Sequence, residues 1–313
     1  MKIAVIGAGA MGSILGGRLA AAGNDVWLVD IFQAHVDAIN QNGLRIKKGD
    51  RVDTIKIKAA ISADAVYAEI GLVDLVLIFV KGIYTEAAIK SAQKLIGDHT
   101  YVLTVQNGVG NADILAKYVP QERVLMGTTL SAGGMIEPGF VLDSSPNNFT
   151  QIMPMKGEVG PAVKMIVDAM NKAGWETEAT PDAEQAIWNK LAVNCCTNAC
   201  CTITRLTCGQ VCEAPFGRNL LTDVIKEVCA VANAKGLPLD WEKVSGHFFD
   251  VYSSSPHYPS MLQDAKKKAK TEVEMITGAV VRDGERLGVP VPVNRTIYNL
   301  ISMISNHYDD QMY

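Results

Sequence analysis

Three polar side chains recur at every fourth position of one predicted helix, namely Lys190, Asn194 and Asn198. At about 100° per residue they form one stripe on a helix whose other faces are apolar. Asn is unfavourable inside a helix, and a solvated face would normally carry Glu and Lys, so we expect the stripe to line a polar cavity. Partial desolvation would weaken the hold of Lys190 on its proton and make it a usable general acid. The alternative is that Lys190 extends to solvent.

A glycine-rich motif follows a predicted strand at 2–6 and precedes a predicted helix at 11–22. The motif G-x-G-x-x-G consists of Gly7, Ala8, Gly9, Ala10, Met11 and Gly12. The first glycine permits a tight turn, the second lets a pyrophosphate approach the backbone, and the third allows close helix packing. Backbone N–H groups and the helix dipole then face the anion. In this context the motif indicates a dinucleotide site rather than a turn without a ligand.

An acidic residue, Asp30, follows the second predicted strand at 25–29, roughly 20 residues after the first glycine of the motif. In that place a carboxylate accepts hydrogen bonds from the ribose hydroxyls of adenosine. It would repel a 2′-phosphate, and residues 31–44 contain no Lys or Arg to offset the repulsion. Asp30 therefore favours NADH over NADPH, unless it is only a solvated residue at a strand end.

Two further polar residues, Lys81 and Asn107, directly follow predicted strands at 75–80 and 101–105. In an open parallel sheet the ligand crevice lies at the carboxyl ends of the strands, so we expect both side chains to face it. The alternative for Asn107, which precedes a glycine, is an ordinary turn.

The order of predicted elements indicates an α/β protein of two domains. Residues 1–180 alternate strands and helices, which predicts a Rossmann-type dinucleotide-binding domain with a parallel sheet and the apolar strand 75–80 at its centre. Its other elements are strands at 44–46 and 54–58 with a polar turn at 47–53 between them, a strand at 124–130, a hairpin within 133–148, a helix at 159–173 and a last strand at 175–180. Residues 181–313 predict a mostly α-helical substrate domain, with helices at 182–202, 215–235 and 265–287.

The composition narrows the classes of partner. Lys and Arg number 29 against 33 Asp and Glu, which gives a net charge of -4. Binding to a phosphate backbone needs a basic surface, so we expect no nucleic-acid partner. No apolar run approaches the ~20 residues of a membrane span, and the first strand is too short for a signal peptide. We therefore expect a soluble, cytoplasmic protein that acts on a small molecule and has no membrane partner.

Six of the seven cysteines fall within residues 195–212. Two pairs have a spacing of four residues, which would place each pair on one helix face. Zinc sites more usually use C-x2-C pairs, and no His lies close by in the sequence. We expect reduced, core-packed thiols without a metal site, with zinc binding as the alternative.

Five segments, in order along the chain, resemble the ketopantoate reductase (2-dehydropantoate 2-reductase) family of the 6-phosphogluconate dehydrogenase-like superfamily. They are the glycine motif, V-Q-N-G-V-G at 105–110, W-N-K-L-A-V-N-x3-N at 188–198, and P-S-M-L-Q-D at 259–264 with T-E-V-E-M-I-T-G-A-V at 271–280. The resemblance spans essentially the whole chain, and the motifs of the second half are the more specific. It implies an enzyme that reduces 2-dehydropantoate to (R)-pantoate with NAD(P)H, a step towards pantothenate and coenzyme A.

The resemblance also implies roles for individual residues. Lys190 would protonate the substrate carbonyl oxygen as hydride arrives, and Glu272 would support both the lysine and the substrate hydroxyl. The substrate would be bound by Asn107, Asn194, Asn198 and Ser260. Asn107 would also touch the cofactor, with Lys81 beside it.

One position departs from the family pattern. Ketopantoate reductases usually prefer NADPH and carry a basic residue where this chain has Asp30. The chain is then either a ketopantoate reductase that uses NADH or an NAD-dependent D-2-hydroxyacid dehydrogenase that acts on other branched 2-keto acids.

A hypothesis from another class is a regulatory protein that senses dinucleotides without turnover. The complete Lys/Asn/Asn/Ser/Glu set argues against it, because a non-catalytic binder need not keep these residues. Apolar residues of the helical half, including 297–304, could form a homodimer or pack internally.

Overall fold

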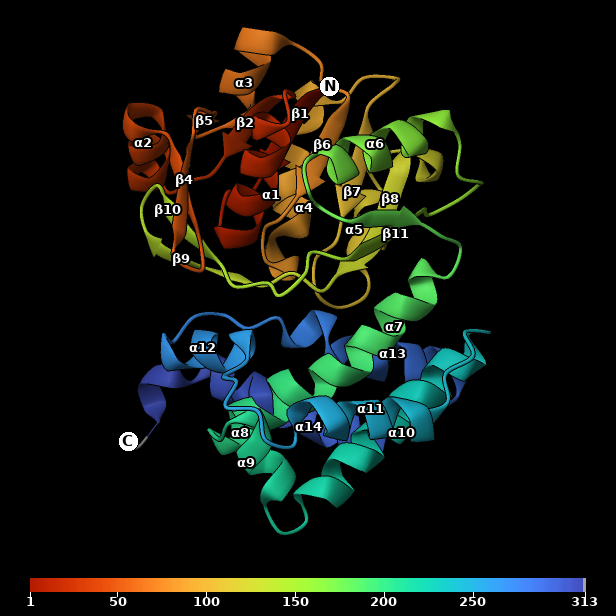
Figure 1. Ribbon diagram of the computed structural model, residues 1–313. Coiled ribbons are helices and arrows are strands. Elements are labelled where there is room, and N and C mark those ends of the chain that lie inside the picture. Colours follow the sequence, from red (N-terminus) through yellow and green to blue (C-terminus); the bar gives the residue numbers. More distant parts are fainter. Residues whose placement is uncertain (312–313) are drawn as a thin grey trace. The chain divides into compact units, whose positions relative to one another are not determined.

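The computed structural model describes residues 1–311, which divide into two compact units. The first unit contains Met1–Gln106 and Asn111–Ala183. The second contains Asn107–Gly110 together with the chain from Glu184 onward. Figure 1 shows strands with helices in the first unit and helices alone in the second, as predicted for the two halves of the chain.

An eight-stranded sheet forms the centre of the first unit, in the order β12-β11-β8-β7-β6-β1-β2-β5. Its strands are β1 (Lys2–Ile6), β2 (Asp25–Val29), β5 (Lys58–Ala60), β6 (Leu75–Ile78), β7 (Tyr101–Thr104), β8 (Val124–Thr129), β11 (Thr150–Pro154) and β12 (Thr177–Ala179). The predicted parallel sheet is confirmed for the six strands from β8 to β5. The two remaining strands are parallel to each other, and β11 runs antiparallel to β8.

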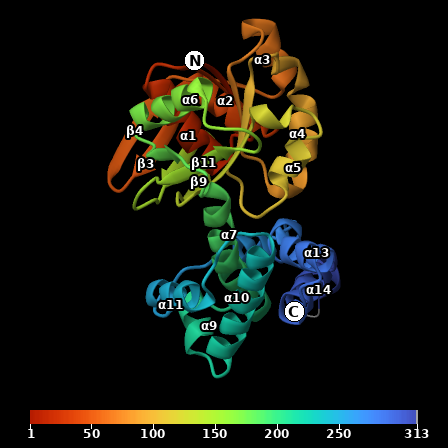
Figure 2. The same ribbon diagram turned by 90° about the vertical axis from the view of Figure 1, so that its right-hand side faces the viewer.

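Helices cover both faces of this sheet. One face packs on α1 (Ala10–Ala21), α2 (Gln33–Asn42) and α6 (Pro161–Lys172), the other on α3 (Ala63–Ile70), α4 (Thr85–Ser91) and α5 (Asn111–Leu115). Figure 2 shows α1 and α6 on one side and α3, α4 and α5 on the other. All four residues of β6 are buried, which confirms the prediction that this strand is central. A strand that is covered on both faces needs apolar side chains at every position.

A second, four-stranded sheet, in the order β4-β3-β10-β9, belongs to the same unit. It consists of β3 (Leu44–Lys48), β4 (Arg51–Ile55), β9 (Gly133–Glu137) and β10 (Phe140–Asp143). The predicted hairpin within 133–148 is confirmed as β9–β10, and its pairing with β3 was not predicted.

Two sequence predictions were wrong in this unit, and one strand was not predicted. The turn predicted at 47–53 is only two residues long, because β3 and β4 extend into it with alternating polar side chains. The strand predicted at 54–58 is two elements, since β4 ends at Ile55 and β5 starts at Lys58. Strand β11 was missed altogether, because Asn and Ser before it and a terminal Pro154 are typical of loops.

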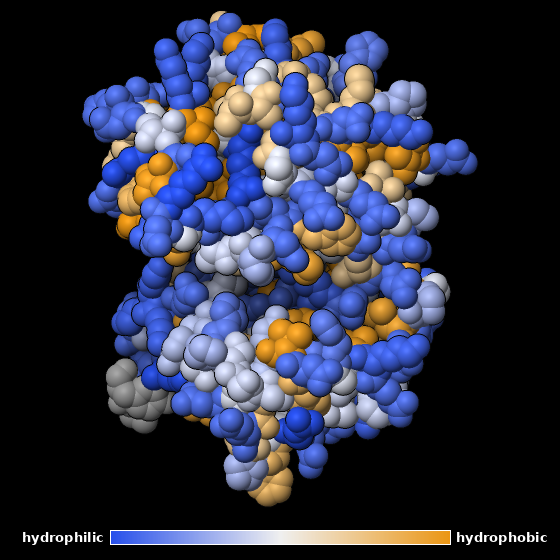
Figure 3. Space-filling model, viewed as in Figure 1, coloured by the Kyte–Doolittle hydropathy of each residue, from blue (hydrophilic) through white to orange (hydrophobic). Residues whose placement is uncertain are grey.

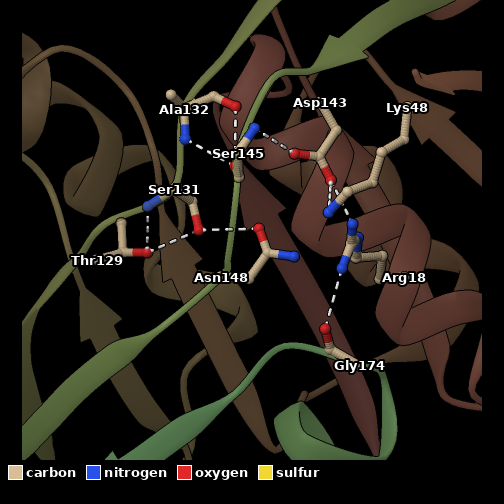
Figure 4. A network of polar contacts seen from close by, with 9 residues as sticks. All are labelled: Arg18, Lys48, Thr129, Ser131, Ala132, Asp143, Ser145, Asn148 and Gly174. Carbon is tan, nitrogen blue, oxygen red and sulfur yellow. Dashed lines mark hydrogen bonds and ion pairs between the residues drawn. The ribbon is translucent and has the colours of Figure 1, made fainter.

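A buried carboxylate joins the helix after the glycine motif to the second sheet (Figure 4). Asp143, at the end of β10, has a fully buried side chain that pairs with Arg18 of α1 and lies 3.6 Å from Nζ of Lys48. Its other oxygen accepts from the backbone N–H of Ser145 at 3.0 Å. Arg18 also donates to the carbonyl of Gly174 at 3.0 Å. The network ties α1, β3 and β10 together through charge.

Helices build the second unit around α10 (Gly217–Ala234) (Figure 2). A continuous helical run comprises α7 (Ala183–Asn194), a π-helical segment (Cys195–Cys200) and α8 (Cys201–Thr204). These elements confirm the predicted helices at 182–202 and 215–235. The sequence reading gave no separate helix for α9 (Cys208–Glu213), α11 (Trp241–Tyr252) or the full length of α14 (Pro292–Asn306). The core contains Trp188, Phe248 and Val280, all essentially inaccessible.

The single helix predicted at 265–287 was wrong. The chain forms α12 (Ser260–Lys266), a non-helical stretch, a 3-10 turn (Val273–Met275) and α13 (Thr277–Leu287). Lys268 has φ +54, in the left-handed region, and Ile276 has φ -104 with ψ -98, so neither residue can continue a helix. The consequence is that Glu272 lies on non-helical backbone.

All seven cysteines are free and buried. Burial raises the pKa of the Cys195 and Cys196 thiols well above their ordinary values. Within residues 1–311, no group of three or more His, Cys, Asp or Glu side chains is placed to hold a metal ion.

Hydrophilic residues predominate on the face shown in Figure 3, and hydrophobic residues form separate small patches. None of the helices in the described part of the chain is long and apolar enough to cross a membrane.

We expect Asp143→Ala to lower the free energy of unfolding by about 3 kcal/mol, because Arg18 would keep its partly buried charge without the carboxylate. Asp53→Ala is the matched control: its partner Arg51 is 79% exposed, so the loss should stay below about 1 kcal/mol. Urea unfolding monitored by circular dichroism measures both variants. Equal losses for the two would show that Asp143 contributes no more than a surface ion pair.

Candidate active site

The glycine motif is packed tightly against the sheet and open on its outer side. Gly7 has φ +96, and a Cβ there would lie 2.6 Å from the backbone nitrogen of Val80. A Cβ at Gly12 would lie 2.1 Å from the carbonyl oxygen of Gly7. A Cβ at Gly9, in contrast, would meet nothing within 4 Å. The loop therefore excludes side chains where it meets the protein and leaves room at Gly9 for a ligand to approach the backbone.

Helix α1 begins at this open position with a terminus that suits an anion. Gly9 is its N-cap and supplies no side-chain hydrogen bond, and the first turn contains no acidic residue. The first N–H groups of a helix lack intrahelical partners and carry a partial positive charge. The backbone at residues 7–12 thus fits the pyrophosphate of a dinucleotide.

Asp30 stands at the carboxyl end of β2, beside β1 and the glycine motif. Its backbone N–H donates to the carbonyl of Ala60 at 3.1 Å, and its Oδ1 accepts from the N–H of Phe32 at 2.9 Å. The residue is partly exposed. One carboxylate oxygen is thereby fixed, which orients the second oxygen for another donor.

Lys81 and Gln106 lie beyond the carboxyl ends of the neighbouring parallel strands β6 and β7. Gln106 joins the two ends: its Nε2 donates to the carbonyl of Val80 at 2.5 Å, and its Oε1 accepts from Thr104 Oγ1 at 2.8 Å. Gln106 was not predicted from the sequence, although its place at a strand end beside Asn107 was a usable signal. Lys81 is partly exposed and precedes a 3-10 turn (Gly82–Tyr84).

The segment Asn107–Gly110 packs with the second unit. The N–H of Val109 donates to the carbonyl of Met275 at 2.8 Å. Gly108 has φ +86, and a Cβ there would lie 2.1 Å from the same carbonyl oxygen. Only glycine permits this approach, which holds Asn107 in the unit that also contains Lys190.

Two of the three residues of the predicted polar stripe, Asn194 and Asn198, are joined by a hydrogen bond. Asn198 Nδ2 donates to Asn194 Oδ1 at 3.3 Å, and Asn198 Oδ1 accepts from Ser260 Oγ at 3.2 Å and from the N–H of Met261 at 3.0 Å. Both asparagines are buried, and Ser260 is exposed at the start of α12. Asn194 Nδ2 is a buried donor with no acceptor among the described residues. The structure thus brings together Asn194, Asn198 and Ser260.

Lys190 lies one helical turn before Asn194 on α7 and keeps partial contact with solvent. Burial lowers the pKa of Lys190 to about 8, and the Glu272 carboxylate opposes this shift by raising the pKa. The two side chains therefore interact electrostatically. An ammonium whose pKa is near neutrality gives up its proton far more readily than an ordinary lysine.

The site residues predicted from sequence fall into two groups. The first unit holds the glycine motif, Asp30 and Lys81, and the second holds the stripe with Asn107, Ser260 and Glu272. The first group fits a dinucleotide, and the second combines a proton donor with hydrogen-bonding groups for a small polar molecule.

Two family models match the chain. "Ketopantoate reductase PanE/ApbA" matches residues 3–154, and "Ketopantoate reductase PanE/ApbA C terminal" matches residues 182–305. The chain belongs to the ketopantoate reductase family. As a ketopantoate reductase family member it is an oxidoreductase, which confirms the resemblance drawn from the sequence motifs.

Curated relatives of this ketopantoate reductase family member cover nearly its full length. The 2-dehydropantoate 2-reductase of Streptococcus pyogenes serotype M1 is 30% identical over 305 residues, 96% of this chain and 97% of the relative. That of Halobacterium salinarum is 31% identical over 303 residues, 97% of this chain and 98% of the relative.

Solved structures also resemble this chain over nearly its full length. D-mandelate dehydrogenase with NADH and anilino(oxo)acetate has a TM-score of 0.91 and 30% identity, and the likeness covers 99% of both chains. A ketopantoate reductase of the PanE/ApbA family from Ralstonia eutropha JMP134 has a TM-score of 0.87 and 31% identity, covering 98% of this chain and 99% of that one.

Proposed function

We propose that this protein reduces 2-dehydropantoate to (R)-pantoate with a reduced nicotinamide cofactor, as a step towards pantothenate and coenzyme A. The observation that carries the proposal is the Lys190 ammonium, whose pKa of about 8 is set by burial against the nearby Glu272 carboxylate. The family models and the curated relatives support the same reaction.

Reduction of a ketone requires a proton donor beside the carbonyl oxygen. Hydride addition to the carbonyl carbon leaves negative charge on the oxygen, and a nearby cation that can yield a proton lowers the barrier. Lys190 fills this role: it is charged at neutral pH and gives its proton to the oxygen as the charge develops. Glu272 holds the lysine in its charged form and directs it. When bound, the nicotinamide cofactor supplies the hydride.

The hydrogen-bonded residues Asn194, Asn198 and Ser260 orient the substrate. The amide of Asn198 is fixed by three contacts, so it orients Asn194 and Ser260. Asn194 Nδ2 is ready to donate to a substrate oxygen, because a buried donor without an acceptor costs about 1–3 kcal/mol until it finds one. The exposed Ser260 hydroxyl can exchange its bond to Asn198 for one to the substrate carboxylate. Asn107 would contact substrate and cofactor.

The glycine motif and Asp30 would hold the cofactor. The N–H groups at the start of α1 would bind the pyrophosphate, and the second oxygen of Asp30 would accept from a ribose hydroxyl. A 2′-phosphate would meet the carboxylate, so we propose NADH as the preferred cofactor although NADPH is the usual one in the family. Lys81 lies beside the cofactor.

A second candidate is an NAD-dependent D-2-hydroxyacid dehydrogenase for other branched 2-keto acids. Asp30 and the likeness to an NADH-bound D-mandelate dehydrogenase favour it. The family models and the names of the curated relatives favour pantoate chemistry, so we place that reaction first. Cytoplasmic location and a homodimer remain predictions.

We expect the purified protein to oxidise NADH with 2-dehydropantoate faster than with other branched 2-keto acids in a steady-state assay. Binding of NADH without oxidation by any 2-keto acid would instead support the dinucleotide sensor.

Lys190→Ala should lower kcat roughly 100-fold or more with NADH binding retained, because only the proton transfer is lost. Lys243→Ala is the control, since its side chain is 86% exposed.

Removing the Glu272 carboxylate should shift the pH dependence of kcat/KM. Lys190 must be protonated to act, so reductase activity falls as pH rises through its pKa of about 8. Glu272→Gln removes the group that raises this pKa, and the alkaline limb of kcat/KM should shift to lower pH. Glu242→Gln, an exposed acid at the start of α11, should leave the limb in place. An unchanged alkaline limb in Glu272→Gln would show that the Glu272 carboxylate does not influence the pKa of Lys190.

The preference of the enzyme for NADH or NADPH tests the proposed role of Asp30. The unmodified enzyme should show the higher kcat/KM with NADH, and Asp30→Ala should narrow the gap because the repulsion of a 2′-phosphate is lost. Asp25→Ala, at the exposed amino end of the same strand, should leave the ratio unchanged. Equal or better use of NADPH by the unmodified enzyme would refute this reading of Asp30.

A further inference from the structure

A buried histidine connects the glycine motif to two other parts of the first unit. His35 of α2 is completely inaccessible. Its Nε2 lies 3.2 Å from Oγ of Ser13 on α1, and its Nδ1 accepts from the backbone N–H of Gly139 at 2.9 Å. Ser13 Oγ in turn donates to the carbonyl of Ala8, inside the motif, at 2.7 Å. These contacts form one chain from Gly139 to Ala8.

The donors in this chain determine where the protons are. The backbone N–H of Gly139 can only donate, so Nδ1 of His35 carries no proton. The Ser13 hydroxyl gives its single proton to Ala8, so toward His35 it must accept, and Nε2 carries the proton. His35 is therefore neutral, with one defined tautomer. A second proton, on Nδ1, would face the N–H of Gly139 and break the chain.

The end of the chain orients a peptide of the motif. The carbonyl of Ala8 is held toward Ser13, and in a planar trans peptide the following N–H points the opposite way. That N–H belongs to Gly9, the position that is open on its outer side. The three hydrogen bonds thus keep the Gly9 N–H directed to the place where a pyrophosphate can reach it.

Charge around His35 is limited. The carboxylate of Asp30, at the end of β2, acts on it, whereas Ser13 and Gly139 bring no charge from the other two elements. Burial lowers the pKa of His35 below its ordinary value of 6.5, and the Asp30 carboxylate and a hydrogen bond to the backbone of Ala8 only partly oppose this. The neutral form is therefore stable at neutral pH, and a proton is taken up only as the pH falls below 6.5.

We propose that His35 is a positioning residue for the dinucleotide: through Ser13 it fixes the Ala8–Gly9 peptide, and its protonation weakens dinucleotide binding. The proposal rests on the proposed function only in that the motif binds a nicotinamide dinucleotide. It adds a residue that touches neither cofactor nor substrate. It also adds a dependence of affinity on pH that the reaction chemistry does not require.

Two conservative variants separate the two ends of the imidazole. His35→Gln can place an amide N–H where Nε2 lies and keep the bond to Ser13, whereas His35→Asn can accept from Gly139 only. We expect calorimetry with NAD⁺ at pH 7.5 to give a Kd within about threefold of wild type for His35→Gln. For His35→Asn and for Ser13→Ala it should be roughly tenfold weaker, the loss of about one net hydrogen bond. The double variant Ser13→Ala/His35→Asn should be no weaker than either single one, because both break the same chain.

The pH dependence gives a readout that a purely structural role would not change. The Kd of wild type for NAD⁺ should rise as the pH falls from 7.5 to 5.0, and that of His35→Gln should stay flat, since its amide does not titrate. Thermal unfolding of each variant shows whether it is folded, and Ser13→Ala replaces His35→Asn if the latter is not. A wild-type affinity that ignores pH, or an acid loss that persists in His35→Gln, would overturn the proposal. So would wild-type affinity in Ser13→Ala. No binding of NAD⁺ by wild type at any pH would instead refute the dinucleotide site itself.

Discussion

Two opposing effects act on the ammonium of Lys190 in the second unit, namely desolvation and attraction by the Glu272 carboxylate. Taking the charge of Lys190 out of water makes its proton easier to remove, and a carboxylate nearby prevents the residue from losing that proton altogether. Neither effect alone would suit a general acid: an exposed lysine holds its proton too strongly, and a buried lysine without a partner would be neutral. The packing around α7 and the non-helical stretch that carries Glu272 are the means by which the fold sets this balance.

Much of the first unit could be predicted from sequence because its signals are local. A strand that is apolar at every position, such as β6, must be covered on both faces, and a glycine motif between a strand and a helix has few other uses. The second sheet escaped prediction because its strands are short and partly polar, and because β3 and β10 are almost a hundred residues apart in the chain. The break before Glu272 was missed since Lys268 adopts left-handed backbone without a glycine to announce it.

The candidate site likewise contains residues with a local sequence pattern and residues whose roles depend on contacts between distant segments. The spacing of Lys190, Asn194 and Asn198 identified a stripe whose hydrogen bonds the structure contains. Ser260 and Glu272 carry no pattern of their own, so only their likeness to family motifs pointed to them. Gln106, Ser13 and His35 act through contacts between distant segments. Side chains of that kind look like ordinary polar residues until the fold brings their partners together.

The π-helical segment Cys195–Cys200 has a consequence for how this enzyme can vary. A π turn accommodates an additional residue within a helix, so shortening the segment by one residue would let it relax to an ordinary α-helix. The residues after the deletion would keep nearly the same rotation relative to α7, because the π turn already absorbs the additional residue, and only contacts made inside the segment, such as those of Asn198, would change. The small thiols that fill this segment can be exchanged for other compact apolar side chains, and a deletion of one residue would leave the helices on its two sides in register. Homologous enzymes that lack one residue here should therefore still align with this chain on both sides of the segment.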